Sequence, residues 1–224
     1  MRQENQLLTK KKEIGMPLGR LETLSDAVFG VVIAFLVTLI NDAPLQSSPG
    51  NLLQGIMDIK HLFLAYFITF ILLSMYWWHH HLIFLYLRKS DTSFMWINMI
   101  FLLWIAFIPF PTNLLITYLK SPDQEVAILI YGGIHIICGF FLYCLWFYAT
   151  HNHCLVVAHM PHRVIIKMKQ LLLLNIGGYV LAIFISFLWM PLALMVFAGI
   201  VILNFIPYYK EAHEIEMNKV SGGG

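Results

Sequence analysis

The sequence predicts an all-α, polytopic membrane protein with six transmembrane helices. Of the 224 residues, 59% are hydrophobic and only 12% are charged, which is about half the charged share of a soluble domain. The hydrophobic residues also form long runs, and an α-helix needs roughly 20 such residues to cross a bilayer. A transmembrane barrel would instead show alternating strands of about ten residues, so we expect helices whose backbone groups are satisfied internally.

Six segments are long and apolar enough to span, and they form one membrane unit without a soluble domain or an internal repeat. In chain order they are residues 20–40, 57–84, 94–118, 125–149, 165–188 and 190–208. We therefore expect a short basic segment at 1–19, a six-helix transmembrane domain at 20–208 and a tail at 209–224. No cleavable signal is expected, because the first apolar run contains Asp26 and no small-x-small motif follows it.

Basic residues in the connections predict the orientation. Connections with several Lys or Arg residues alternate with connections that have one or none, and this pattern places the basic side in the cytoplasm. Both termini are then cytoplasmic. The basic residues that carry this prediction are Arg2, Lys10, Lys11, Lys12 and Arg20 before the first span, Arg88 and Lys89 after the second, Arg163, Lys167 and Lys169 after the fourth, and Lys210 and Lys219 in the tail.

Polar residues within the spans predict a cluster in the cytoplasmic leaflet. The first span begins RLETLSD, and its Asp26 lies roughly 9 Å deeper than Arg20 along a helix. An ionisable group at that depth is costly unless it is paired, and it commonly marks a functional site. By depth, the cluster comprises Arg20, Ser25 and Asp26 of the first helix, Trp77 and His80 of the second, and Asn98 of the third. In the competing interpretation, Arg20 and Glu22 reach the interface and Asp26 is only a helix-end charge.

Beyond Asp26, the first span offers one face for a pathway. Val31, Phe35 and Thr38 are spaced i, i+4 and i+7 and therefore share a helix face. Such a face is compatible with pore rings and a hydrophobic constriction. It is equally compatible with ordinary packing, in which Thr38 bonds only its own backbone.

Four stretches resemble the short bacterial form of the transmembrane protein 175 potassium channels. The first is R-x-x-x-[FL]-S-D at residues 20–26, and the second is W-x-x-H-H-x-x-F at residues 77–84. The third and fourth are Asn98 and the I-P-F-P-T of residues 108–112. The resemblance implies a homotetramer of six-helix chains around a central pore lined by the first helix, without a T-V-G-Y-G filter. It also implies a network of Arg20, Ser25 and Asp26 with His80 and Asn98, and pore rings at Val31, Phe35 and Thr38.

The expected function is that of a weakly potassium-over-sodium selective cation channel in a bacterial inner membrane. The expected partners are potassium ions, further copies of the chain and membrane lipid, with no nucleic acid, no cofactor and no metal. The chain departs from the family's pattern at Leu24, which replaces a usual Phe, at Ala34, which replaces a usual Thr, and at Phe35 and Thr38, which replace usual Leu residues. Because of these departures, the resemblance supports the location of the pore more strongly than it supports the family's ion selectivity.

Other functions are weaker matches. A proton-coupled secondary transporter would use Asp26 and His80 as a relay, but the chain lacks the repeats of most transporters. An enzyme is not expected, because no nucleophile with a base and no H-E-x-x-H motif is present. Two further patterns are expected to be structural: the histidines and cysteine of residues 151–162, whose spacing matches no standard metal site, and the N-I-G-G-Y of residues 175–179, which lies in an apolar run.

Overall fold

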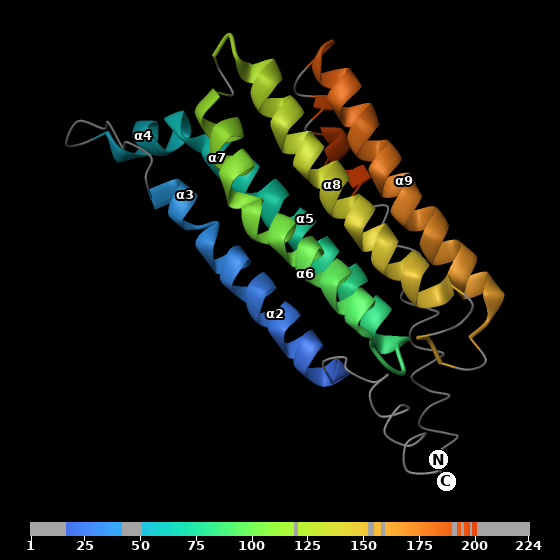
Figure 1. The fold of residues 1–224 in the computed structure, drawn as a ribbon. Coiled ribbons are helices and arrows are strands. Elements are labelled where there is room, and N and C mark those ends of the chain that lie inside the picture. Colours follow the sequence, from blue (N-terminus) through green and yellow to red (C-terminus); the bar gives the residue numbers. More distant parts are fainter. Residues whose placement is uncertain are drawn as a thin grey trace, which may run out of the picture.

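The chain folds into a bundle of membrane-length helices (Figure 1). The structure is a computed structural model that describes residues 17–41, 51–118, 121–151, 155–157, 160–189, 192–193, 195–197 and 199–200. Its elements are α2 Leu18–Phe35, α3 Thr38–Asn41, α4 Leu52–Asp58, α5 Lys60–Leu85, α6 Thr92–Phe107, α7 Pro109–Tyr118, α8 Gln124–Thr150 and α9 His162–Ser186. The prediction of an all-α membrane protein is confirmed for these residues, in which the only β-type pairing is the isolated bridge between Leu87 and Val156.

Five of the six predicted spans lie within the described residues. They are α2 with α3, α5, the pair α6 and α7, α8, and α9, all of which are long and apolar enough to cross a membrane. Most of the sixth, at residues 190–208, lies outside the described residues. Its described positions between 192 and 200 are helical, and Phe197 stacks on Tyr179 of α9. The sixth span, the orientation, the tetramer and the three-part division of the chain therefore stay predictions.

Two predicted spans are interrupted near their C-terminal ends. The span expected at 94–118 breaks at Ile108, because Pro109 has no backbone N–H to continue the ladder. The span expected at 20–40 is found at Leu18–Ile40, and within it α2 ends at Phe35 and the helix resumes at Thr38 after a turn at Leu36 and Val37. The backbone N–H groups of Leu39 and Ile40 bond carbonyls three residues back, which is the tighter 3₁₀ pattern.

The connection between the first two spans contains a helix that the sequence did not predict. Residues 41–56 were expected to be a loop, but α4 occupies Leu52–Asp58 and lies across the direction of the other helices (Figure 1). Its Leu52, Leu53 and Met57 are exposed. The second span then begins at Lys60 instead of residue 57.

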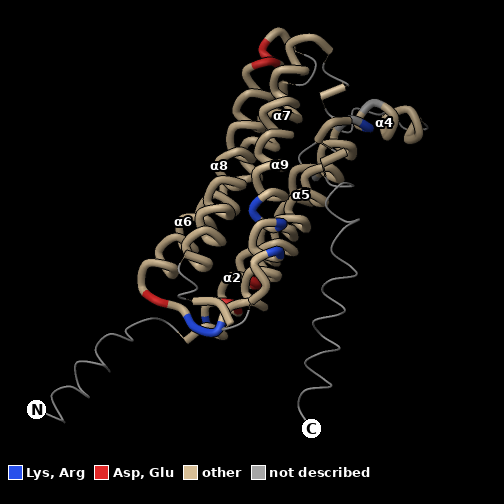
Figure 2. Tube along the Cα trace, turned by 90° about the vertical axis from the view of Figure 1, so that its right-hand side faces the viewer, with Lys and Arg blue, Asp and Glu red and all other residues tan. Residues whose placement is uncertain are grey.

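The Asp and Glu positions lie toward the two ends of the bundle, and Lys and Arg positions lie at the ends and also partway along it (Figure 2). The connection from α5 to α6 carries Arg88 and Lys89, and it pairs with the residues after α8: Arg88 N donates to Leu155 O at 2.8 Å. Asp91 accepts from Phe94 N at 2.8 Å and caps α6. Lys60 begins α5 at the opposite end, so that end is not free of basic residues.

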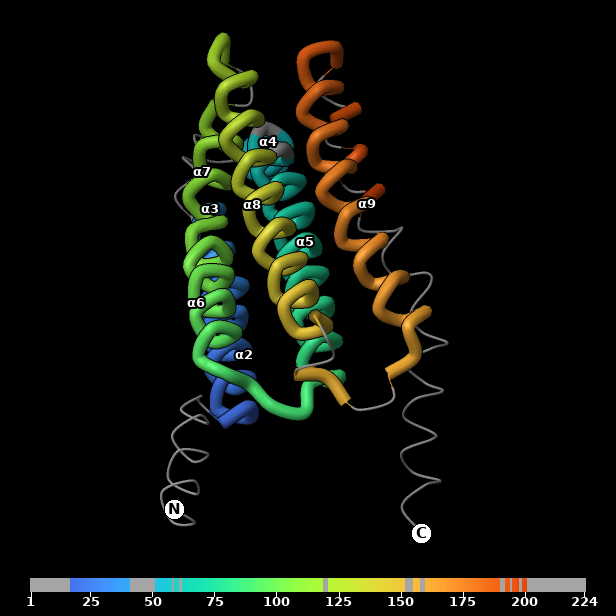
Figure 3. The backbone as a smooth tube through the Cα atoms, turned by 45° about the vertical axis from the view of Figure 1, so that its right-hand side comes forward, coloured from blue at the N-terminus to red at the C-terminus, as the bar shows by residue number. Residues whose placement is uncertain are grey.

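Helix α2 forms one edge of the bundle. It packs against α5 and α6, whereas α8 contacts α6, α7 and α9 (Figure 3). Only 22% of the most apolar window of the first span is buried in the chain, compared with 50% for α5 and α8. A large apolar surface of α2 is thus left without a partner inside one chain.

Candidate functional site

Helix α2 has one face that is buried against the bundle and another that is exposed. Leu21, Ser25, Phe29 and Val32 are buried against the bundle. On the opposite face, Val31 is 64% and Phe35 60% exposed. The predicted pore residues of α2 therefore point away from the chain's own core, where only lipid or another chain can cover them.

A buried hydrogen-bond chain joins α2, α6 and α5. His80 Nε2 lies 2.8 Å from Asn98 Oδ1, and because that oxygen can only accept, Nε2 is the donor. Asn98 Nδ2 donates to Ser25 Oγ at 3.0 Å, and Ser25 Oγ donates to Leu21 O at 2.8 Å. All three polar side chains are at most 1% exposed. His80 Nε2, Asn98 Nδ2 and Ser25 Oγ each donate one hydrogen bond in this chain, which offsets the cost of burying these polar groups.

Aromatic rings surround the imidazole of His80 on three sides. Its ring centroid lies 4.4 Å from that of Phe84, 5.6 Å from that of Phe101 and 5.8 Å from that of Phe29. The rings come from α5, α6 and α2 and fix the orientation that aims Nε2 at Asn98. Sequence reasoning missed Phe29 and Phe101, although each lies one helical turn from a predicted cluster residue, on the same face.

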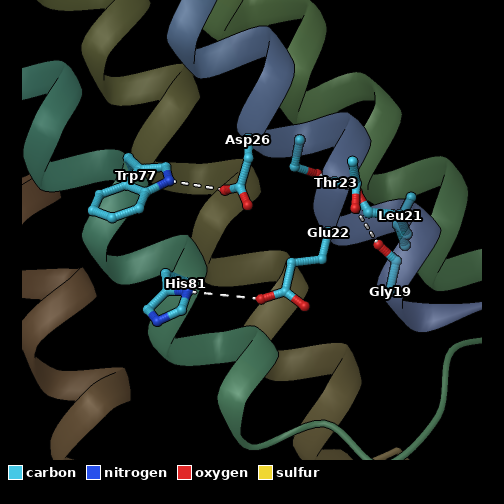
Figure 4. Close-up of polar contacts among 8 residues, drawn as sticks. Gly19, Leu21, Glu22, Thr23, Asp26, Trp77 and His81 are labelled. Carbon is cyan, nitrogen blue, oxygen red and sulfur yellow. Dashed lines mark hydrogen bonds and ion pairs between the residues drawn. The ribbon is translucent and has the colours of Figure 1, made fainter.

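A second pair of contacts joins α2 to α5 at an exposed edge (Figure 4). Trp77 Nε1 donates to Asp26 Oδ1 at 2.9 Å, and Glu22 Oε1 lies 3.7 Å from His81 Nδ1. The Glu22 and His81 side chains are 36% and 31% exposed. Pairs at such exposure contribute little to stability. These two contacts therefore add little to the stability of the α2–α5 packing.

Arg20 is not brought into the cluster by this chain alone. It is exposed, and its side chain makes no hydrogen bond or ion pair to any described residue. Helical spacing puts Arg20 on the face of Val31 and Phe35, roughly 140° around the axis from Ser25. The three signature residues therefore separate: Ser25 is buried, Asp26 bonds Trp77 at the edge, and Arg20 lies on the outward face.

Thr38 lies beyond the break in the first span. It is half-buried, and its Oγ1 donates to Phe35 O at 2.7 Å. The backbone bond that was the competing interpretation for this residue is thus present. The hydroxyl oxygen keeps its lone pairs, so it remains able to accept or to face a cation.

The remaining sequence patterns are placed as follows. The N-I-G-G-Y stretch lies inside α9, with Asn175 and Tyr179 buried, so its backbone carbonyls serve the helix. Of the histidine and cysteine group after α8, His151 and His162 are exposed, and the other members lie outside the described residues. Among the residues that are described, no three His, Cys, Asp or Glu side chains come together as a metal site would require.

Comparison with known proteins adds three findings. A family model described as "Endosomal/lysosomal potassium channel TMEM175" matches residues 20–109. A potassium channel of Streptomyces collinus is 27% identical over 177 residues, which cover 79% of this chain and 85% of the relative. The crystal structure of a lysosomal potassium-selective channel TMEM175 homologue from Chamaesiphon minutus superposes with a TM-score of 0.71 at 26% identity, covering 84% of this chain and 96% of that one.

The matched residues include the RLETLSD motif, Trp77, His80 and Asn98. The family model, the bacterial relatives and the solved structure agree with one another and with the geometry described above. The chain therefore resembles the TMEM175 family model over residues 20–109 and bacterial potassium channels over more than three quarters of its length, and its membrane-length helices make it an integral membrane protein.

Proposed function

We propose that the chain forms a potassium-permeable cation channel, as a homotetramer in a bacterial inner membrane. Its pore is lined by the first helix of each copy, and potassium passes modestly better than sodium. The named relatives are potassium channels, which supports potassium as the permeant ion. The tetramer rests on the family resemblance.

The observation that carries this proposal is the outward apolar face of α2. Val31 is 64% and Phe35 60% exposed within one chain, so this face is available to meet the same face of other copies. Around a symmetry axis, the same face forms rings, of which Phe35 is the bulkiest. Apolar rings of this kind restrict conduction by excluding water from the constriction.

Thr38 supplies a polar ring beyond Phe35 in this proposal. Its proton is committed to Phe35 O, so the oxygen presents lone pairs, which suit a partly dehydrated cation. Ala34 leaves the position before Phe35 without a hydroxyl. Selectivity then depends on Phe35 and Thr38 together, because one sets the width and the other the polarity.

Flux into proteoliposomes tests the proposal. Purified protein is reconstituted, and the reversal potential is measured with potassium on one side and sodium on the other. Phe35→Ala should raise the flux and bring the potassium-to-sodium ratio toward one. Phe184→Ala is the matched control, because Phe184 is 67% exposed on α9 at the far edge of the bundle, and it should leave both quantities unchanged. Absence of conductive flux, or equal effects of the two variants, contradicts the proposal.

A proton-coupled transporter remains the alternative function, and the same liposomes distinguish it. His80 bonds Asn98 and Asp26 bonds Trp77, so no direct hydrogen bond links the two proposed relay groups. Coupled transport predicts potassium movement that requires an opposing proton gradient and saturates. A pH-sensitive dye inside the vesicles reports that proton movement directly.

A further inference from the structure

An open groove runs between α9 and the described positions of the sixth span. Its walls extend from Gln170 to Leu181 on α9 and from Leu192 to Ile200 on the sixth span, and its volume is about 890 Å³, within the usual range of small-molecule sites. Helix α9 lies at the edge of the bundle farthest from α2 (Figure 1). The proposed pore therefore does not use this groove.

Glycines leave the groove open along both of its walls. A Cβ atom added at Gly177 of α9 or at Gly199 of the sixth span would meet nothing within 4 Å. At Gly178, by contrast, an added Cβ would lie 2.9 Å from the side chain of Ile200, so the two helices touch there. The groove thus has a closed floor and open walls, and a molecule of the surrounding membrane can enter it from the side.

The polarity of α9 changes in steps along the line of the groove. The exposed Leu174 and Leu181 make part of the wall apolar, and the exposed amide of Gln170 lies at one end. Two basic residues continue this face toward the start of α9. Spacings of i, i+4, i+7, i+11 and i+18 place these five residues on one side of the helix: Arg163, Lys167, Gln170, Leu174 and Leu181.

The length of the groove matches one leaflet of a bilayer. The eleven-residue rise from Gln170 to Leu181 is about 16 Å along the helix axis, and half of the hydrocarbon core is about 15 Å. The order of two cations, one amide and an apolar wall is also the order of a phospholipid's phosphate, ester groups and acyl chain.

We propose that the groove binds one anionic phospholipid from the leaflet at which α9 begins. The acyl chain lies along Leu174 and Leu181, and the Gln170 amide donates to an ester carbonyl. The phosphate lies at Arg163 and Lys167, since guanidinium and ammonium groups are the usual protein partners of phosphate. Basic pockets between transmembrane helices bind lipid headgroups in this way on the cytoplasmic side, which is the side predicted for this end of α9.

The charges at this end of the bundle favour a lipid over a second copy of the chain. The acidic side chains described here already bond residues of their own chain: Glu22 contacts His81, Asp26 accepts from Trp77, and Asp91 accepts from Phe94 N and Tyr148. A neighbouring copy thus has no uncommitted carboxylate among these residues to place against Arg163. A phospholipid brings its own anion together with the apolar chain that the groove accepts.

Lipid retention by the purified protein tests the headgroup site. The protein is titrated in detergent with phosphatidylglycerol against a background of phosphatidylcholine, and bound lipid per chain is counted by native mass spectrometry. One phosphatidylglycerol per chain should be retained. Replacing both basic residues, R163Q with K167Q, should weaken that affinity roughly ten- to thirty-fold. The matched control is R88Q with K89Q, which removes the same charge from exposed positions at the same end of the bundle and should change nothing. Equal losses in the two double variants would show general surface attraction and overturn the proposal.

A substitution inside the groove tests the acyl-chain site separately. Gly177→Leu fills the open wall without touching the basic residues, and leucine favours a helix more than glycine does. It should abolish the retained lipid, whereas Gly133→Leu on α8, where an added Cβ also meets nothing within 4 Å, should leave retention unchanged. Full retention by Gly177→Leu would overturn the proposal. So would a smaller assembly on size exclusion, because the groove would then be a contact between copies. Neither measurement depends on whether the protein conducts ions.

Discussion

Replacing Asn98 by leucine should destabilise the protein more than any other single change in the α2–α5–α6 cluster. Asn98 is fully buried, accepts from His80 Nε2 and donates to Ser25 Oγ. Leucine has the same branched shape and number of side-chain heavy atoms but no polar atoms, so it leaves the His80 N–H without an acceptor. That orphan costs about 1–3 kcal/mol, and the lost bond to Ser25 adds about 0.6 kcal/mol at membrane depth.

The expected total of about 1.6–3.6 kcal/mol corresponds to a fall of about 3–14 °C in melting temperature for a chain of this size. The assay is thermal unfolding in detergent, followed by the loss of the monodisperse peak on size exclusion. Asn113→Leu is the matched control, because Asn113 is exposed on α7 and makes no hydrogen bond to the described residues. It should change the melting temperature by less than about 2 °C.

A second substitution makes the prediction sharper. His80→Phe combined with Asn98→Leu removes both partners, and the new phenylalanine fits among Phe84 and Phe101. Replacing both members of a buried pair by apolar groups of similar shape is nearly neutral. The double variant should therefore regain most of the lost stability. A double variant as unstable as the sum of the two single variants would refute the reasoning, as would an unchanged Asn98→Leu.

Three further changes test separate parts of the structure. Asp26→Ala removes the acceptor of Trp77 Nε1 at an exposed edge and should lower the melting temperature by less than Asn98→Leu does, whereas a fall as large as that of Asn98→Leu would contradict a minor role for this edge. Thr38→Val keeps the side-chain shape and removes the hydroxyl, so the potassium-to-sodium permeability ratio from reversal potentials should change; an identical ratio would place Thr38 outside the pore. Gly132→Ala would put a Cβ 2.6 Å from an isoleucine of α9 and should cost about 1–3 kcal/mol, whereas Gly133→Ala meets nothing within 4 Å and should leave thermal stability unchanged or slightly raised.

Run length and hydropathy predicted the existence and approximate bounds of five helices. The fourth span was expected at 125–149 and is found at Gln124–Thr150, because a continuous apolar run in a bilayer has no stable structure other than a helix. The unexpected break in the first span has a different origin. It lies beside the bond from Thr38 Oγ1 to Phe35 O, and hydropathy carries no information about a side chain that competes for a backbone carbonyl.

The position of each polar residue along its span predicted which residues lie at the same depth in the membrane. It did not predict toward which side of the helix each one points. Ser25, His80 and Asn98 were expected at a common depth, and the structure joins them directly. Arg20 was expected in the same cluster, yet it lies on the opposite face of α2. A helical wheel of residues 20–26 would have separated Arg20 from Ser25, so that part of the error was avoidable. The aromatic box around His80 depends on three helices meeting, which one sequence does not reveal.

The rotation of α2 connects the buried cluster to the proposed pore. Helices in a bilayer are not driven together by the hydrophobic effect, so packing and hydrogen bonds decide how each is turned. Val32 would pack nearly as well if α2 turned by one residue, because Val31 and Ile33 are also apolar, but the same turn would bring Arg20 or Glu22 to the buried position of Leu21. Ser25 would lose its contact, since a turn of roughly 100° carries its hydroxyl away from Asn98. The buried contact at Ser25, together with the edge contacts of Asp26 and Glu22, therefore favours the rotation of α2 in which Val31 and Phe35 face outward.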